Sequence, residues 1–402
     1  MVGIDSLRKT ILLTGCLAVF LSVFASSMLN IALPSIMDRF RLSQAVAAWA
    51  IASYLLCYAL LMPVTGAMSD RWGRKKIFVA GTALFLLGTT LAALSSSFSL
   101  LLLARCLQGI GAAAMFPPAT AMVREMFTSK SGRAMGFVTA GASVGMLLGP
   151  PVSGYLLEIG DYRGIFLVIL PLAVLLLVTG IYAVSDRPDD RDRISLPRDN
   201  TVKLPPFYKE PAYVAVVVIV VCQNFIASSL SITFPLMFIR DFHLSPGHTG
   251  SLFSAFPLSF LIASPLGGYL ADKKGYRVPV TLGSLLLVAA LVLLSVGPAH
   301  TVLLVTALFA VMGLAFGLSL SPLSLGSMEH ASEMDLAKAS GLFGFFRQSS
   351  GSAGIVITPL LGSSNPVFAY LAVLLLLGLI LFVALNHIEL SANNSNRGEN
   401  VQ

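Results

Sequence analysis

Long apolar runs, separated by short polar breaks, occupy most of this 402-residue chain. A helix that crosses a bilayer needs about 20 mostly apolar residues, and such runs recur twelve times between residues 10 and 386. We therefore predict an all-α integral membrane protein with twelve transmembrane helices. The predicted spans are residues 10–34, 46–68, 77–97, 99–122, 134–157, 163–184, 212–239, 248–271, 278–298, 301–325, 340–362 and 365–386.

The second half of the chain repeats the first in outline. The segment Phe24–Pro34 is echoed by Phe225–Pro235, 201 residues later, and Phe40–Ser43 is echoed by Phe242–Ser245, 202 residues later. Apolar chains made of two related halves are typical of secondary transporters, which move one half against the other. We therefore expect the twelve spans to form two pseudo-symmetric six-helix bundles.

Polar segments separate and follow the two predicted bundles. Residues 185–211 form the one long polar connection, and their charges and prolines are typical of a linker. We predict an N-terminal bundle at residues 1–184 and a C-terminal bundle at residues 212–386, joined by this cytoplasmic linker. Residues 387–402 are predicted to be a disordered cytoplasmic tail.

Charge sets the predicted orientation. Only 11% of the residues are charged and the mean hydropathy is +0.85, whereas soluble domains are about 25% charged. With a cytoplasmic N-terminus, the cytoplasmic segments hold 20 of the 26 Lys and Arg residues and the outer segments hold four. This distribution follows the positive-inside rule and places both termini in the cytoplasm. It also explains most of the net charge of +7 without a nucleic-acid partner.

A basic turn rich in glycine is predicted between the second and third spans, and a second copy between the eighth and ninth. Glycines permit a tight turn, and the repeated spacing argues against a plain basic membrane anchor. The residues are Gly66, Asp70, Arg71, Gly73 and Arg74, and in the second copy Gly268, Asp272 and Gly275, with Tyr276 at the position of Arg74.

These residues match the loop motif of the major facilitator superfamily, which the chain resembles over essentially its whole length. In that family the loop latches the cytoplasmic side of the two bundles while the protein is open outward. The resemblance implies a monomer in a bacterial inner membrane. Because the second copy is degraded, we expect the first copy to matter more.

An arginine inside the fourth span predicts a functional group. A mid-span arginine costs about 2.5–3.5 kcal/mol on insertion scales. Arg105 should therefore face the bundle interior beside Gln108, which lies three residues further on the same helical face. The alternative is an arginine that extends to the outer interface. The pattern resembles the span-four motif of drug:proton antiporters, in which the arginine is linked to proton transfer.

Regularly spaced glycines mark the fifth span. Gly145 and Gly149 leave a face without side chains for a neighbouring helix, and Pro150 predicts a kink. The string continues to Gly154, with Ser153 in place of a glycine, and resembles the antiporter motif of the same superfamily. That motif is associated with exporters. Ordinary tight helix packing is the alternative explanation.

No acidic residue lies in the middle of a predicted span. The antiporter branch that the chain resembles through Asn30–Pro34 commonly has an aspartate in span one, where this sequence has Ala25. Proton coupling would therefore use Asp70 or Asp38, with Arg105 as the charge partner. Alternatively, Asp70 only holds the latch.

Polar side chains within the spans are candidates to line a substrate cavity. Two arginines and no carboxylate would favour an anionic or zwitterionic amphipathic compound. Structural hydrogen bonds between helices are the alternative for single amides. The candidates are Asn30, Tyr54, Tyr58, Gln108, Asn224, Arg347 and Gln348.

These observations predict an exporter of small amphipathic compounds that works by alternating access against inward proton flow. A proton-independent facilitator or importer of an organic anion or other metabolite is the first alternative, and a non-transporting sensor or lipid-handling protein is the second. We expect no enzymatic activity, cofactor or metal. The sequence has no Gly-x-x-x-x-Gly-Lys-Ser/Thr nucleotide loop, and its five histidines lack metal-ligand spacing.

Overall fold

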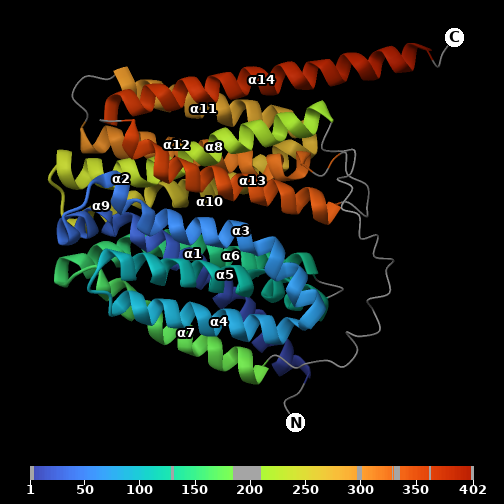
Figure 1. Ribbon diagram of the computed structural model, residues 1–402. Coiled ribbons are helices and arrows are strands. Elements are labelled where there is room, and N and C mark those ends of the chain that lie inside the picture. The colour runs from blue at the N-terminus through green and yellow to red at the C-terminus, as the bar shows by residue number, and fades with distance from the viewer. Residues whose placement is uncertain are drawn as a thin grey trace. The chain divides into compact units, whose positions relative to one another are not determined.

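A computed structural model of the chain is almost entirely helical (Figure 1). It describes residues 4–127, 131–183, 210–296, 301–327, 329, 336–361 and 364–399. No strand occurs within these ranges. The all-α fold predicted from the sequence is confirmed.

The helices form two compact units, and each is described by itself. Unit 1 comprises Met1–Asn200 and Phe234–Ser254, and unit 2 comprises Thr201–Thr233 and Ala255–Gln402. Residues 234–254, which the sequence predicts in the C-terminal bundle, therefore belong to unit 1. Most of the predicted linker lies outside the described residues, so the bundle boundaries stay a prediction.

The described residues of unit 1 form seven helices from the first half of the chain and two short ones from the segment 234–254. Helix α5 packs on α3 and α4, α6 packs on α1 and α9, and α7 packs on α1 and α4. The elements are α1 (Ile4–Phe40), α2 (Gln44–Ala47), α3 (Trp49–Trp72), α4 (Arg74–Ala93), α5 (Phe98–Met126), α6 (Ser131–Ile159), α7 (Arg163–Ala183), the π-helical η4 (Met237–Asp241) and α9 (Pro246–Phe253).

Unit 2 contains the other helices that the structure describes. Helix α12 packs on α10 and α11, and α14 packs on α11. The elements are α8 (Pro211–Leu236), whose last turn enters unit 1, α10 (Ala255–Lys274), α11 (Arg277–Val296), α12 (Val302–Gly326), α13 (Leu336–Ile357), the short η5 (Thr358–Leu360) and α14 (Ser364–Glu399).

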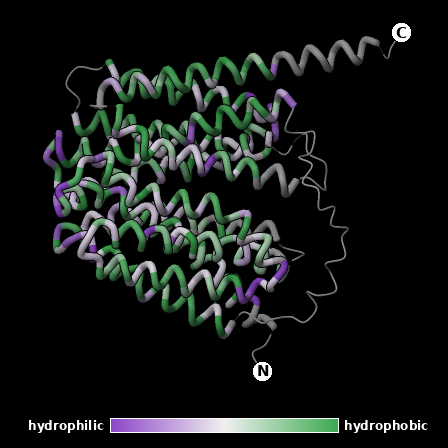
Figure 2. The backbone as a smooth tube through the Cα atoms, viewed as in Figure 1, coloured by the Kyte–Doolittle hydropathy of each residue, from purple (hydrophilic) through white to green (hydrophobic). Residues whose placement is uncertain are grey.

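Ten helical segments in the described ranges are long and apolar enough to cross a membrane. Figure 2 shows apolar residues along the helices, with the most hydrophilic residues near helix ends and turns. Apolar side chains such as Leu87 and Leu103 are about half exposed, at 50% and 54%, as expected of a surface that faces lipid. The two other predicted spans fall on α6 and α13, which are rich in glycine and serine. The count of twelve therefore stays a prediction.

Helix α14 extends further than expected. Its backbone is helical to Glu399, whereas the sequence predicts disorder from residue 387. Adding residues to an existing helix costs far less than starting a new one, so the apolar part of α14 can continue into the polar segment.

The two halves repeat each other in local geometry as well as in sequence. Arg41 and His243 follow corresponding helices, and their φ values of 53° and 55° are the positive values found for non-glycine residues in the described chain. The hydroxyls of Ser97 and Thr301 accept the amide three residues later and cap α5 and α12. These caps align α5 with α12 at an offset of 204 residues.

Candidate functional site

Both predicted glycine turns contain a glycine with a positive φ. Gly73 follows α3 with a φ of 96° and Gly275 follows α10 with a φ of 76°, values that side chains with a Cβ rarely adopt. Their amides donate to the carbonyls of Ser69 and Ala271 at 3.1 and 2.9 Å. The repeat therefore places a glycine with positive φ and the same amide-to-carbonyl hydrogen bond at the end of both helices.

The side chains around these turns differ in exposure. Arg71 and Asp272 are exposed and Arg74 is half-buried, while the side chain of Asp70 lies outside what the structure describes. At the other glycine positions, a Cβ on Gly66 would lie 3.8 Å and one on Gly268 would lie 3.6 Å from the nearest atom, which is ordinary contact. Close helix approach is thus not the reason for these two glycines, and the latch role stays a prediction.

Arg105 of α5 is fully buried and joins three helices. Its Nε donates to the Ala50 carbonyl of α3 at 2.9 Å, and its Nη1 donates to Oε1 of Gln108 at 2.8 Å. Gln108 is also fully buried, and its Nε2 donates to the Thr89 hydroxyl of α4 at 2.8 Å. The predicted pair of Arg105 and Gln108 therefore lies on one face and is completed by Thr89.

An aromatic ring covers the arginine. The guanidinium carbon of Arg105 lies 4.3 Å from the centroid of the Tyr54 ring, a distance typical of a cation–π contact. The Tyr54 hydroxyl donates to the Ser22 carbonyl of α1 at 2.8 Å, and the ring of Tyr58 lies parallel at 6.2 Å. The buried charge is thus stabilised by carbonyl and amide dipoles and a π face.

No carboxylate occurs among the contacts that the described structure gives Arg105. Its Nη2 is buried without a hydrogen-bond partner, although a buried charge is normally paired with an opposite charge. Asp38, the predicted partner, has a side chain that is 77% exposed and pairs with Arg240 of η4 at 3.3 Å. The geometry does not bring Asp38 and Arg105 together, and the role of Asp70 stays a prediction.

The glycine face of α6 packs on the backbone of α1. A Cβ on Gly145 would lie 2.8 Å from a carbonyl oxygen of α1, and one on Gly149 would overlap the Ser27 hydroxyl. Ser27 donates to the Gly145 carbonyl at 3.1 Å, and Ser153 donates to the Met28 carbonyl at 2.7 Å. Ser153, which replaces a glycine of the motif, therefore adds a hydrogen bond between the two helices.

The second part of the same motif packs on α9. A Cβ on Gly154 would overlap the carbonyl of Pro246, and a Cβ on Gly250 would overlap the carbonyl of Pro150. Larger residues at either glycine would separate the two helices. The motif predicted in the fifth span thus contacts two different helices of unit 1, α1 and α9.

A proline supplies a further link to α9. Because Pro151 has no N–H, it leaves the Leu147 carbonyl without its usual donor within the helix. Ser254 at the end of α9 donates its hydroxyl to this carbonyl at 3.1 Å. The adjacent prolines in the sequence were the signal that an α6 carbonyl would be free to bond elsewhere.

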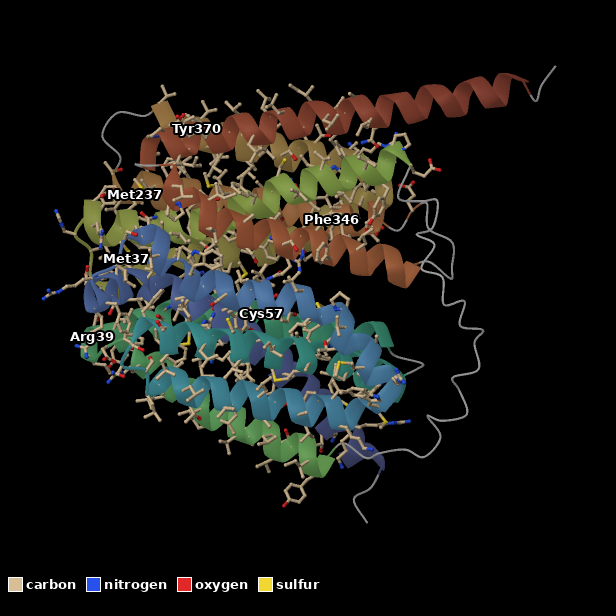
Figure 3. The ribbon with its side chains drawn as sticks, viewed as in Figure 1. Met37, Arg39, Cys57, Met237, Phe346 and Tyr370 are labelled. Carbon is tan, nitrogen blue, oxygen red and sulfur yellow. The ribbon has the colours of Figure 1, made fainter. Side chains whose placement is uncertain are left out.

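Glu158, which sequence analysis missed, contacts the start of α9. Its Oε1 accepts the Gly247 N–H at 3.0 Å, and the Ser245 side chain also bonds to the carboxylate. These hydrogen bonds hold the pKa of Glu158 below its ordinary value. Met37 at the end of α1 and Met237 in η4 are both buried, whereas the side chain of Arg39 points outward (Figure 3).

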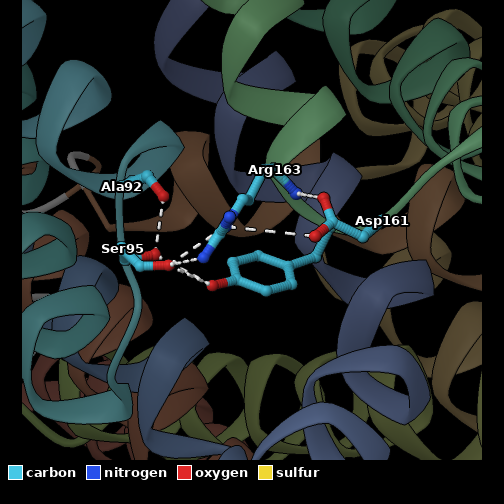
Figure 4. Close-up of polar contacts among 5 residues, drawn as sticks. Ala92, Ser95, Asp161 and Arg163 are labelled. Carbon is cyan, nitrogen blue, oxygen red and sulfur yellow. Dashed lines mark hydrogen bonds and ion pairs between the residues drawn. The ribbon is translucent and has the colours of Figure 1, made fainter.

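A second missed cluster fixes the turn between α4 and α5 (Figure 4). The Ser95 carbonyl accepts the Tyr162 hydroxyl at 2.9 Å and Nη2 of Arg163 at 2.7 Å. Arg163 also lies 3.9 Å from Asp161. One carbonyl at the end of the serine-rich break therefore holds the start of α7, and we interpret this cluster as structural.

The candidate cavity residues fall into two groups, one in each unit. In unit 1, Tyr54, Tyr58 and Gln108 belong to or adjoin the Arg105 network, and Asn30 is half-buried on α1. Their joint role in one substrate cavity stays a prediction.

The group in unit 2 lies where α8 meets α13. The Asn224 side chain donates to the Arg347 carbonyl, and a Cβ on Gly351 would lie 2.7 Å from Nδ2 of Asn224. Gln348 accepts the Ser352 hydroxyl at its carbonyl, 3.2 Å away. In the described parts of the chain, no three His, Cys, Asp or Glu residues gather as metal ligands.

Comparisons with known proteins agree with this architecture. The multidrug resistance protein Stp of Mycobacterium tuberculosis is 25% identical over 401 residues, covering 87% of this chain and 74% of that protein. The drug efflux pump JefA of the same organism is 25% identical, covering 89% and 82%. An uncharacterised transporter of Escherichia coli, YebQ, is 26% identical, covering 87% and 89%.

Two solved structures share the fold. A bacterial homologue of the human lysosomal transporter Spinster, in an inward-facing and occupied conformation, has a TM-score of 0.80 at 15% identity and covers 94% of this chain and 97% of that one. The nucleoside transporter NupG has a TM-score of 0.79 at 13% identity, covering 93% and 99%. The sequence model of the Major Facilitator Superfamily matches residues 15–354 and 216–401. Since this match spans most of the chain, the protein belongs to the major facilitator superfamily.

Proposed function

We propose that this chain exports small amphipathic compounds by alternating access, in exchange for protons that move inward. The observation that carries the proposal is the α6 string, in which Gly145 and Gly149 lie on the α1 backbone and Gly154 lies on α9. This string resembles the motif associated with exporters. Relatives named for multidrug resistance and drug efflux, at about 25% identity, support the same direction.

The proposed setting is a monomer in a bacterial inner membrane with both termini in the cytoplasm. The strong bias of Lys and Arg toward one side supports the orientation. Substrate translocation involves no covalent chemistry and no cofactor in this proposal. We propose that the two six-helix bundles predicted from the sequence, with residues 234–254 in the second bundle, move relative to each other during transport.

Arg105 is the residue that we propose to connect substrate and proton movement. It is a buried charge with no carboxylate among its described contacts. Such a charge favours the approach of a negative group. That group would be the anionic part of a substrate or a carboxylate that becomes deprotonated, for which Asp70 is the candidate.

A proton-independent facilitator or importer of an organic anion or another metabolite is the alternative. It is favoured by Ala25, which stands where the antiporter branch commonly has an aspartate. In the described structure Ala25 is fully buried in α1 and offers no group to titrate.

Proton flux in proteoliposomes tests the proposal. The purified protein would be reconstituted with a pH-sensitive dye inside, under an imposed pH gradient, and exposed to dyes, antibiotics and organic anions. Substrate-dependent proton movement that is absent from protein-free liposomes would support the antiporter. Substrate flux without proton flux would support the facilitator, and flux directed inward under the same gradient would support an importer.

A further inference from the structure

Residues 234–254 connect two helices of unit 2 but pack in unit 1. Helix α8 belongs to unit 2 through Thr233, and α10 begins in unit 2 at Ala255. The segment between them consists of the last turn of α8, η4 and α9, and we call it the docked segment. Whatever holds the docked segment on α6 therefore restrains the chain at both of its connections to unit 2.

Glycines and backbone carbonyls set the close approach of α6 and α9. Gly154 and Gly250 each bring a helix against a carbonyl of the other, and the Ser254 hydroxyl bonds to the Leu147 carbonyl. Such contacts define a close fit but involve no ionised group. Glu158, one turn beyond Gly154, adds a charge to this interface.

The position of Glu158 is suited to hold α9. The helix has eight residues, and the Ser245 side chain caps it by accepting the His248 N–H. The Gly247 N–H is one of the unpaired donors at its start, and the Glu158 carboxylate accepts it at 3.0 Å. A negative charge at a helix N-terminus is stabilising, and so short a helix depends on contacts outside itself.

We propose that Glu158 is a positioning residue that locks the docked segment onto α6, and that release of this contact is a step of the transport cycle. The second clause rests on the alternating-access function proposed above. The lock lies on the side of the membrane that the charge distribution predicts to face outward.

Other charged groups surround this lock. His248 of α9 lies close enough to act electrostatically on Glu158. Asp161 follows in the turn after α6 and contacts Arg163. The pair of Asp38 and Arg240 joins α1 to η4 and is largely exposed, so it should contribute little to docking.

A distance measurement tests the lock without any substrate. Spin labels would be placed at Tyr155→Cys on α6 and Ser251→Cys on α9, both exposed positions, after replacement of the four native cysteines. In lipid nanodiscs at neutral pH, the labelled protein that keeps Glu158 should give mainly a short distance between the two labels. Glu158→Gln should raise the separated fraction by about two- to fivefold, because it removes the charge at the helix start.

Two further variants keep the result interpretable. Asp161→Asn removes a carboxylate three residues away that contacts Arg163, and its distance distribution should match that of the unmodified lock. Gly247→Ala leaves every charge in place, but its Cβ would lie 2.6 Å from Oε1 of Glu158 and displace the carboxylate. Gly247→Ala should separate the labels as Glu158→Gln does. Because the two variants test the same contact independently, one remains informative if the other folds poorly.

The outcomes separate this inference from the proposed function. Unchanged distances in both Glu158→Gln and Gly247→Ala would overturn the lock, whatever the flux assay shows. Separated labels, together with a changed turnover per folded transporter and an unchanged KM, would support both clauses. Separated labels with unchanged turnover would overturn the second clause. A lack of flux for every compound tested would count against the proposed function and leave the lock supported by the distances.

Discussion

Equivalent helix pairs are held together by different chemistry in the two units. In unit 1, α5 packs on α3 with the Arg105 guanidinium 4.3 Å from the Tyr54 ring. In unit 2, α12 packs on α10, and the capping residues align Phe309 with Arg105. Phe309 lies with its ring centroid 5.2 Å from that of Phe256, the counterpart of Tyr54. A cation–π contact in one half is an aromatic pair in the other.

The backbones approach each other in the same way in both pairs. Gly109 would place a Cβ against the Tyr54 carbonyl, and Gly313 would place one against the Phe256 carbonyl. The apolar pair therefore holds this geometry without any charge. Because burying a charge is expensive, Arg105 is not explained by packing, which supports its assignment to transport.

The largest predicted effect is on stability and falls in unit 2. Phe309→Ala should lower the free energy of unfolding by about 3–5 kcal/mol, because it removes a buried ring and leaves a cavity. Thermal denaturation in detergent would measure the loss. Phe309→Leu, which keeps most of the volume, should cost clearly less. Equal losses from the two substitutions would contradict the view that ring packing holds α10 on α12.

The second largest effect is expected when the polar pair of unit 1 is replaced by the apolar residues at the equivalent positions of unit 2. Arg105→Phe combined with Gln108→Met copies Phe309 and its neighbour Met312. The free energy of unfolding of the double variant should lie within about 1 kcal/mol of the original value or above it. Replacing a buried polar network by apolar residues is often neutral or stabilising. Its transport rate in proteoliposomes should fall at least about tenfold, the equivalent of 1.4 kcal/mol in the transport barrier.

Single substitution separates the two contributions. Arg105→Phe alone leaves Oε1 of Gln108 buried without its donor, which should cost about 1–3 kcal/mol of stability. Thr89 would still donate to the Phe85 carbonyl at 2.7 Å. Full transport by the stable double variant would show that the charge has no part in function. It would contradict the view that unit 1 keeps a buried arginine for transport while unit 2 has an aromatic pair.

The sequence predicted this comparison only in part. Internal repeats located both glycine turns, and the rule that buried charges need partners placed Arg105 in the interior beside Gln108. The sequence could not predict that Thr89 completes the network, since a hydroxyl in an apolar span usually bonds to its own helix. It also could not predict Glu158, because which helix start lies near a carboxylate depends on tertiary packing.

The two glycine turns give a smaller and sharper test. Gly73→Ala and Gly275→Ala each force a Cβ into positive φ with no neighbouring atom within 4 Å. Each should therefore cost about 1–3 kcal/mol, because a residue with a Cβ is strained by about that much in a sparsely populated backbone conformation. Denaturation of each variant would measure this cost.

Transport should separate these two variants. Tyr276, at the position of Arg74, is buried and donates to Oδ1 of Asn386 at 3.0 Å, so the second turn is fixed to its own unit. If the first turn is the functional copy, Gly73→Ala should reduce the transport rate more than Gly275→Ala at equal stability. Equal reductions in transport would mean that the degraded copy functions as well as the first.

The smallest effect is a pH dependence confined to one of two corresponding short helices. Helix α9 starts with the Ser245 cap and Glu158, whereas its counterpart α2 starts at Ser43 with no side-chain cap bond. Hydrogen bonds hold the pKa of Glu158 below its ordinary value. Its contribution to docking should therefore be complete above the ordinary carboxyl pKa of about 4.3 and disappear as the pH falls through the lowered value.

Distances between labels on α6 and α9 would follow this change between neutral and strongly acidic pH. The separated fraction should stay constant down to about pH 4.3 and then rise, while Glu158→Gln should show the raised fraction throughout with no such transition. Because the carboxylate is exposed, added salt should weaken the contact at neutral pH as well. A transition near neutral pH that survives Glu158→Gln would contradict this assignment, because it would show that a group other than Glu158 controls the docking of α9.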